Sequence, residues 1–325
     1  MESREIPRLG TSVSVIGLGT WQLGADWGDV DPDAARATLD AAYTAGVTFF
    51  DTADVYGDGR SEQFCGALKA EHPEVFVATK MGRRVEQVAL NYNRENFLAW
   101  NRRSRENLGQ SRLQLVQLHC PPDDVFTDRG TYEALDEMVD HGLIEHYGVS
   151  VETCAQALEA IARPHVATVQ IILNCFRLKP LEEVLPAARK AGVGIIVRVP
   201  LASGLLTGRY DENTRFAADD HRNYNRTGEA FDVGETFAGV PFEVGLRAVE
   251  ELRELVDEGT TLAQFALRWV IDQAGVSTVI PGARNPEQVT QNVSAAELPP
   301  LRAAQRDGVQ AIYDRHIRDH VHDRW

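Results

Sequence analysis

The chain has 325 residues, a formal net charge of −15 and a hydrophobic content of 43%, which is ordinary for a globular protein with one large or two smaller domains. The negative charge disfavours binding to nucleic acid or to an anionic membrane. Because no apolar run approaches the ~20 residues of a membrane helix and residues 1–5 are polar without a signal-like core, we expect a cytoplasmic protein.

Strand-like and helix-like segments alternate along the chain, as they do in parallel β/α units. We predict strands at residues 13–18, 46–51, 75–79, 113–118, 145–149, 167–172, 194–199 and 276–280. Residues 33–43, 181–189 and 242–256 have the apolar spacing of helices instead. Eight such units specify a (β/α)8 barrel, an α/β fold of the TIM type, and we predict that residues 1–325 form a single barrel domain.

One connection is much longer than the others. Residues 209–240 are polar and charged and follow the seventh predicted strand. Loops of this length in compact domains are usually functional or disordered. In a barrel, this loop would lie over the face that carries the chemistry.

Four polar residues stand where predicted strands end: Asp51, Tyr56, Lys80 and His119. Residues at the carboxyl ends of neighbouring barrel strands converge on one face, so these side chains are expected to form one site. An ammonium beside a tyrosine lowers the pKa of the phenol, a carboxylate keeps the lysine charged, and an imidazole can orient a substrate oxygen. Together they fit the reduction of a carbonyl group, although Lys80 alone would also suit Schiff-base chemistry.

Five further segments appear in a recognisable order: Gly-Leu-Gly-Thr-Trp at 17–21, Asp-Thr-Ala-Asp-Val-Tyr-Gly at 51–57, Gly-Val-Ser at 148–150, Pro-Leu-Ala-Ser-Gly-Leu-Leu-Thr-Gly at 200–208 and Ile-Pro-Gly-Ala-Arg at 280–284. With the four strand-end residues, they resemble the aldo-keto reductases, including the channel-subunit-like branch, over residues 5–300. The resemblance implies an NADPH-dependent reductase in which Tyr56 donates the proton, Lys80 and Asp51 lower its pKa, and His119 orients the carbonyl. It also implies that residues 6–13 form a hairpin that caps the barrel floor and that no metal is required.

The resemblance further assigns the cofactor site, NADP(H) being the expected cofactor. It implies that Gly19, Thr20 and Trp21 contact the cofactor, that Ser150 and Gln170 hold the carboxamide, that Leu201 and Gly204 approach the pyrophosphate, and that Gly282, Arg284, Gln288 and Asn292 hold the adenosine end. Trp21, Tyr56 and His119 would also contact substrate. A Rossmann fingerprint is disfavoured, because Gly17 and Gly19 are followed by a third glycine only at Gly24. A helix start near Pro286 independently suits a phosphate.

The chain departs from the family pattern beside the expected nicotinamide site. Val151 stands where many members have asparagine, and Arg198 and Val199 stand where many have an aromatic residue and serine. A flat guanidinium can itself stack on a π face. We therefore predict that Arg198 faces the cofactor ring and that its charge favours anionic substrates.

The cysteines and the C-terminal histidines give weaker indications of function. The four cysteines lack C-x-x-C spacing, so reduced thiols are expected. His316 and His320 share a helical spacing, but a solvated helix or a tail over the pocket mouth is favoured over a zinc site. The expected partner is a small carbonyl or alcohol substrate. The sequence is compatible with a monomer and with a homo-oligomer. A redox-sensing, cofactor-binding subunit without significant turnover is the alternative function.

Overall fold

A computed structural model of the protein describes residues 1–24 and 31–325. Within these residues, eight strands hydrogen-bond in parallel in the order β10-β9-β8-β7-β6-β5-β4-β3, and parallel bridges from Ile16 to Val279 and from Gly19 to Gly282 close the barrel. The strands are β3 (Leu18–Gly19), β4 (Phe49–Asp51), β5 (Phe76–Met81), β6 (Leu113–His119), β7 (Ile144–Ser150), β8 (Val166–Ile172), β9 (Gly194–Arg198) and β10 (Val276–Val279). The predicted (β/α)8 barrel is confirmed.

The prediction of a first barrel strand at residues 13–18 is correct only for its second half, where Ile16 and Leu18 pair with Val279 and Phe50 of the barrel. Residues Thr11–Ser14 form β2, which pairs antiparallel with β1 (Ser3–Ile6), and the first barrel strand is only the short β3. The chain reverses between β1 and β2 because Gly10 takes a φ of 62°, a conformation that glycine adopts at little cost. Both segments contain β-formers, so the sequence pattern could not separate the hairpin strand from the barrel strand.

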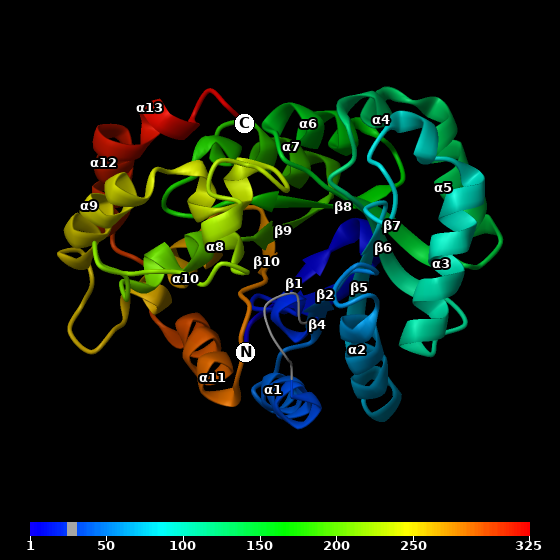
Figure 1. The fold of residues 1–325 in the computed structure, drawn as a ribbon, viewed down its shortest axis with the longest axis horizontal. Helices are drawn as coiled ribbons and strands as arrows, with labels where there is room; N and C mark the ends of the chain where they lie inside the picture. The colour runs from blue at the N-terminus through cyan, green and yellow to red at the C-terminus, as the bar shows by residue number, and fades with distance from the viewer. Residues whose placement is uncertain (25–30) are drawn as a thin grey trace.

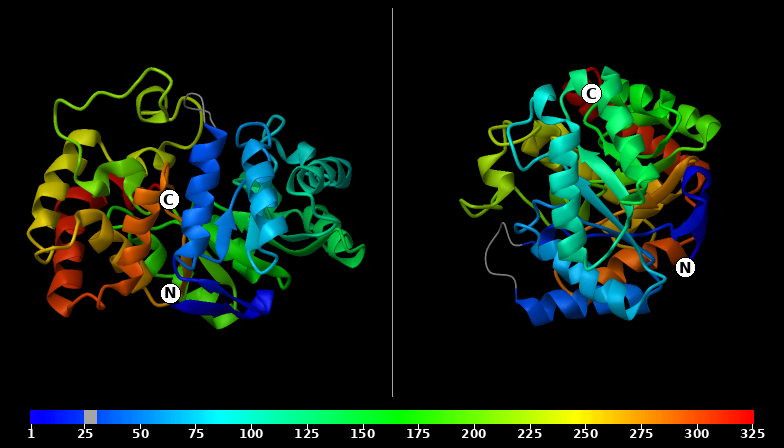
Figure 2. Two further views of the ribbon diagram at one scale, coloured as in Figure 1. Left: turned by 90° about the horizontal axis from the view of Figure 1, so that it is seen from below. Right: turned by 90° about the vertical axis from the view of Figure 1, so that its right-hand side faces the viewer.

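The β1–β2 hairpin closes one end of the barrel, as expected from the family resemblance. Its buried Ile6 and Val13 pack with Phe49, Leu115 and Ile196, whose side chains point into that end of the barrel. Figure 2 shows the hairpin in dark blue at one end of the molecule and the yellow-green loop after β9 at the other. The opposite end is therefore the one left for a binding site.

Helices surround the barrel, as Figure 1 shows. They are α1 (Pro32–Thr44), α2 (Arg60–Glu71), α3 (Arg94–Leu108), α4 (Asp123–Thr127), α5 (Arg129–Asp140), α6 (Cys154–Ala162), α7 (Val184–Ala191), α8 (His221–Tyr224), α9 (Phe242–Arg253), α10 (Leu262–Ile271), α11 (Pro286–Val293), α12 (Ala303–Ile312) and α13 (Arg318–Val321). The predicted helices at 33–43, 181–189 and 242–256 correspond to α1, to α7 with the short turn before it, and to α9. Among the described residues, no helix is both long and apolar enough to cross a membrane.

The C-terminal tail packs against the long loop, residues 209–240. The indole Nε1 of Trp325 donates to Asp232 Oδ1 at 3.0 Å, and the Arg177 guanidinium lies 3.7 Å from the Trp325 ring centroid. His316, one of the two histidines with helical spacing, is paired with Glu251 of α9 at 2.7 Å. The tail therefore supports the loop that follows β9.

Candidate active site

Asp51, Lys80 and His119 lie at the carboxyl ends of the adjacent strands β4, β5 and β6. Tyr56 lies in the turn between β4 and α2. Three left-handed residues follow it, Gly57, Asp58 and Gly59, and they reverse the chain into α2 so that Tyr56 stays at the barrel rim. At position 57 a Cβ atom would lie 1.7 Å from the Gly24 carbonyl oxygen, so only glycine fits this turn.

The four side chains form one cluster. The Lys80 ammonium is ion-paired with Asp51, and it donates to Thr52 O at 2.9 Å and to the Tyr56 hydroxyl at 3.4 Å. The His119 ring stands edge-on to the Tyr56 ring with centroids 5.9 Å apart. Lys80 is only 1% exposed and Asp51 only 3%, so water screens their interaction little. The convergence expected from the strand ends is present.

Two glutamines hold the second oxygen of Asp51. Gln170 Nε2 donates to Asp51 Oδ2 at 2.8 Å and Gln117 Nε2 at 3.2 Å, and both amides are buried. Gln117 was missed by the sequence reasoning. It precedes His119 by two residues on β6 and therefore points to the same face, so strand alternation was the signal that could have identified it.

The protonation states follow from burial and neighbouring charge. Burial raises the pKa of Tyr56 above 10, with Lys80 opposing that shift, so the expected net lowering of the Tyr56 pKa is not found. Burial opposes the charge on Lys80, but Asp51 and Tyr56 outweigh it and raise its pKa. Burial also lowers the pKa of His119 well below its usual value, with Arg83 acting in the same direction. At neutral pH the site thus presents a phenol, an ammonium and a neutral imidazole.

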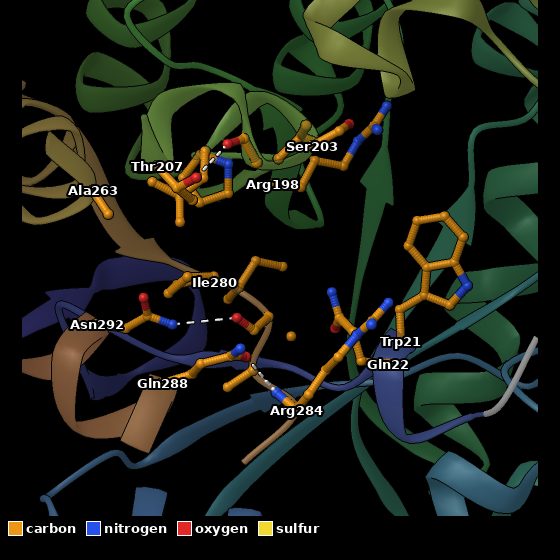
Figure 3. A pocket seen from close by; sticks show the side chains of 18 of the residues that line it. Trp21, Gln22, Arg198, Ser203, Thr207, Ala263, Ile280, Arg284, Gln288 and Asn292 are labelled. Atoms are coloured by element: carbon orange, nitrogen blue, oxygen red, sulfur yellow. Dashed lines mark hydrogen bonds between the residues drawn. The ribbon is translucent and has the colours of Figure 1, made fainter. Parts of the chain in front are cut away.

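A cavity of about 480 Å³ opens beside this cluster. Asp51 and Tyr56 line it, together with eleven of the expected cofactor residues: Gly19, Thr20, Trp21, Gln170, Arg198, Leu201, Gly204, Gly282, Arg284, Gln288 and Asn292. Ser150 is buried and does not line the cavity; its hydroxyl oxygen lies 3.4 Å from Cys120 Sγ. Figure 3 shows Arg284, Gln288 and Asn292 along one side of the cavity, with Arg198 and Ser203 along the opposite side.

The side of the cavity near α11 suits an anion. Asn285 caps this helix by accepting from Gln288 N at 2.9 Å, and Pro286 occupies its first turn as predicted. The Gln288 side chain in turn accepts from Arg284 N at 2.9 Å. A cation beside a helix N-terminus is an arrangement that favours phosphate.

The opposite side is built from the segment that follows β9. Ala202, Ser203 and Gly204 have consecutive positive φ angles of 47°, 52° and 96°, which turn the backbone sharply at the cavity wall. The N–H groups of Ala202 and Gly204 donate to Val199 O at 3.1 Å and to Leu201 O at 2.9 Å within this turn. Leu201 and Gly204 both line the cavity, so a ligand in the cavity would contact the main chain here.

The long loop supplies aromatic side chains to the cavity mouth. Trp21 lies with its ring centroid 6.2 Å from Tyr56, 5.2 Å from His221 and 6.2 Å from Phe231. His221 and Phe231 belong to the loop, and His221 lines the cavity. The loop thus lies over the active face, as expected from its position after the seventh barrel strand.

Arg198 is buried and contacts a group of partly buried side chains, one further arginine and two glutamates. Its Nη2 donates to Glu152 Oε2 at 2.7 Å, and its Nη1 lies 3.7 Å from Glu235 Oε1. Arg83 donates to Glu235 at 3.1 Å and lies 3.6 Å from Glu152. These four residues, which we call the ionic quartet, were not grouped by the sequence reasoning. Because two carboxylates balance the two guanidiniums, the charge of Arg198 alone gives no reason to expect a preference for anionic substrates.

Within the quartet, the pKa values of the two carboxyl groups are shifted in opposite directions. Burial raises the pKa of Glu152. Burial opposes ionisation of Glu235 as well, but Arg83 and Arg198 outweigh it and lower its pKa to about 2. The described residues Cys120, Glu152 and Glu235 also bring ligand-type atoms within 4.8 Å of one another, but the arginines already neutralise both carboxylates.

Asp54, in the turn before Tyr56, is a fully buried carboxyl group whose two oxygens have no hydrogen-bond partner among the described residues. Burial and the nearby Glu62 raise its pKa to about 7. The Asp54 pKa is thus higher in the folded protein than in the unfolded chain, where it is near 3.8. This difference stabilises the folded state below pH 3.8, and the contribution is lost as the pH rises towards 7.

We therefore expect Asp54→Asn to be more stable than the wild type at pH 8, by a few degrees in Tm, and to lose most of that advantage at pH 5. Thermal unfolding at both pH values measures the difference. Asp58→Asn, an exposed neighbour, serves as the control. An Asp54→Asn advantage that is the same at pH 5 and pH 8 would show that Asp54 titrates normally in the folded protein.

Known proteins resemble this chain over most of its length. The family model described as "Aldo/keto reductase family" matches residues 15–314. The chain is 32% identical to Aldo-keto reductase YhdN of Bacillus subtilis over 299 residues, covering 89% of this chain and 87% of that protein. It is 30% identical to a probable voltage-gated potassium channel subunit beta of Oryza sativa, covering 93% of each.

Solved structures show the same fold. The glycerol dehydrogenase AKR11B4 from Gluconobacter oxydans superposes with a TM-score of 0.80 at 31% identity, over 97% of this chain and 96% of that one. An aldo/keto reductase from Klebsiella pneumoniae in complex with NADP and acetate has a TM-score of 0.68 at 22% identity, over 94% of this chain and 93% of that one. At that identity, the second likeness concerns the fold alone.

Proposed function

This chain belongs to the aldo/keto reductase family, and on that basis we propose that it reduces an aldehyde or ketone to an alcohol with NADPH, reversibly. The single observation that carries the proposal is the contact of the Tyr56 hydroxyl with the buried Lys80 ammonium, 3.4 Å apart at the wall of a cavity that also contains Arg284. A proton donor and a phosphate-type site thus share one cavity.

Each member of the cluster has a role in the proposed reaction. Tyr56 donates its proton to the carbonyl oxygen, and Lys80 stabilises the phenolate left behind. Asp51, held by Gln117 and Gln170, keeps Lys80 charged and in place. Neutral His119 contributes a hydrogen bond that orients the substrate oxygen.

The cavity also fits NADP(H). NADPH, when bound, supplies the hydride that is added to the carbonyl carbon. Arg284 and Gln288 would hold the 2′-phosphate and Asn292 the adenine, whereas the left-handed segment at residues 202–204 would approach the pyrophosphate. Trp21, Tyr56 and His119 would contact the substrate.

A redox-sensing subunit without significant turnover is the second candidate, and the similarity to a probable potassium channel subunit beta favours it. The two functions differ in turnover. Protein mixed with NADPH and a panel of aldehydes and ketones should consume many equivalents of NADPH if it is a reductase. Binding of NADPH with less than one equivalent consumed would favour the sensor instead.

We expect Arg198→Tyr to tighten NADP+ more than NADPH. Removing this guanidinium leaves Glu152 and Glu235 with only Arg83, and the resulting negative charge attracts the positively charged oxidised nicotinamide. Fluorescence titration with both cofactors measures the effect, with Arg198→Lys as the charge-preserving control. If both affinities change by the same factor in Arg198→Tyr, Arg198 does not act on the nicotinamide ring.

A further inference from the structure

Two arginines converge beside the reaction site from distant parts of the chain. Arg83 follows β5 and Arg198 ends β9, and both direct their guanidinium groups at Glu235 Oε1, at distances of 3.1 and 3.7 Å. A pair of guanidiniums of this kind is a typical binding site for a carboxylate. In this protein Glu235 supplies that carboxylate.

Glu235 lies at the cavity that contains the proposed proton donor. Glu235, Arg198 and Tyr56 line the same cavity, whereas Glu152 does not contribute to its wall. The Glu235 side chain is only 12% exposed. A substrate whose carbonyl reaches Tyr56 therefore shares the cavity with Glu235.

The segment around Glu235 is anchored at both sides. The Ser203 hydroxyl donates to Glu235 O at 2.9 Å and accepts from Phe237 N at 3.1 Å. Asp232 caps the short turn Val233–Glu235 and accepts from the Trp325 indole at 3.0 Å. The tail and the segment after β9 thus hold the backbone around Glu235 in place. The position of its carboxylate does not depend on the ion pairs alone.

We propose that Glu235 is a specificity-determining residue: it occupies the Arg83–Arg198 site in the manner of a substrate carboxylate and so restricts the enzyme to uncharged carbonyl compounds. The inference rests on the proposed carbonyl reductase activity. A substrate carboxylate entering the cavity beside Tyr56 would meet the ionised Glu235, which already pairs with Arg83 and Arg198. An uncharged substrate would meet no such repulsion.

The charge balance makes this proposal quantitative. Replacing Glu235 by glutamine removes one negative charge from the quartet, so the site beside the cavity becomes more positive by one unit. A charge-assisted hydrogen bond contributes ~1.5–3 kcal/mol, which corresponds to roughly 10- to 150-fold in affinity. Solvent at the cavity mouth screens part of this, so we expect a change near the lower end, about tenfold.

Two aldehydes of equal size provide the test, 4-formylbenzamide and 4-formylbenzoate, which differ in charge. Wild-type protein should reduce the amide with the higher kcat/KM. Glu235→Gln should raise the benzoate-to-amide ratio of kcat/KM about tenfold, mainly through KM. Glu229→Gln, an exposed site in the same loop whose hydrogen bonds among the described residues stay within its own turn, should leave the ratio unchanged.

Calorimetry of benzoate binding gives a readout that needs no turnover. Glu235→Gln should bind benzoate, and wild type and Glu229→Gln should bind it at least about tenfold more weakly. Adding Arg83→Gln to Glu235→Gln restores the charge balance and should remove the gain. If wild type oxidises NADPH neither with 4-formylbenzamide nor with any other compound of the aldehyde and ketone panel, the reductase proposal fails, whereas the benzoate measurement still tests the role of Glu235.

Two results would overturn the inference. A wild-type enzyme that prefers 4-formylbenzoate to the amide shows that Glu235 does not exclude anions, and this result requires no variant to fold. A folded Glu235→Gln protein whose two kcat/KM values fall by the same factor shows that Glu235 serves only to fasten the loop.

Discussion

Tyr56→Phe is expected to lower kcat for carbonyl reduction by about 10²- to 10⁴-fold, the usual contribution of general acid catalysis. The substitution removes the hydroxyl that faces the Lys80 ammonium at 3.4 Å and leaves the ring contacts with Trp21 and His119 in place. Because the hydroxyl is not needed to hold the cofactor, the Kd for NADPH should change little. Steady-state assays and fluorescence titration measure the two quantities.

Tyr43→Phe is the matched control for Tyr56→Phe. The Tyr43 hydroxyl donates to Glu74 on the outside of the barrel, so its loss should not affect turnover. If Tyr56→Phe keeps more than about a tenth of the wild-type kcat, Tyr56 is not the proton donor and the proposed roles of Lys80 and Asp51 fail with it.

Arg284→Ala is expected to weaken NADPH binding by roughly 10- to 150-fold and NADH binding much less. Only NADPH carries the 2′-phosphate, for which a guanidinium beside the N-terminus of α11 is suited. The selectivity of NADPH over NADH should therefore fall, and it should fall less at high salt, where the wild-type contact is itself screened. Titrations with both cofactors at two salt concentrations measure this.

Arg215→Ala controls for the loss of a positive charge from the same face. Arg215 is exposed in the long loop, and within the described part of the chain it donates to backbone carbonyls of its own turn alone. The Arg215→Ala substitution should leave the affinities for NADPH and NADH unchanged. Equal losses of NADPH and NADH affinity in Arg284→Ala would place the 2′-phosphate elsewhere.

The barrel and the four-residue cluster could be predicted from the sequence because both depend on local pattern. Strand ends can be located from apolar runs, and parallel strands bring their ends to one face. The hairpin strand Thr11–Ser14 was misassigned because its pairing partner, β1, is chosen by the turn at Gly10 and not by the strand pattern itself.

The ionic quartet could not be predicted, because its members come from four separate segments. Arg83, Glu152 and Arg198 follow or end different strands, and Glu235 arrives from the long loop. No local spacing relates them. The direction of the Tyr56 pKa shift was missed for a related reason: the sequence shows that a lysine is near, but the extent of burial, which dominates here, depends on the whole fold.

Transfer of deuterium from NADPH that carries deuterium at both C4 positions of the nicotinamide tests the central claim most directly. The account predicts that wild-type protein converts an uncharged aldehyde to an alcohol with one deuterium on the carbinol carbon for each NADPH consumed, and that Tyr56→Phe slows this transfer by about 10²-fold or more. An alcohol without deuterium, or an aldehyde trapped by borohydride as an adduct on Lys80, would contradict it.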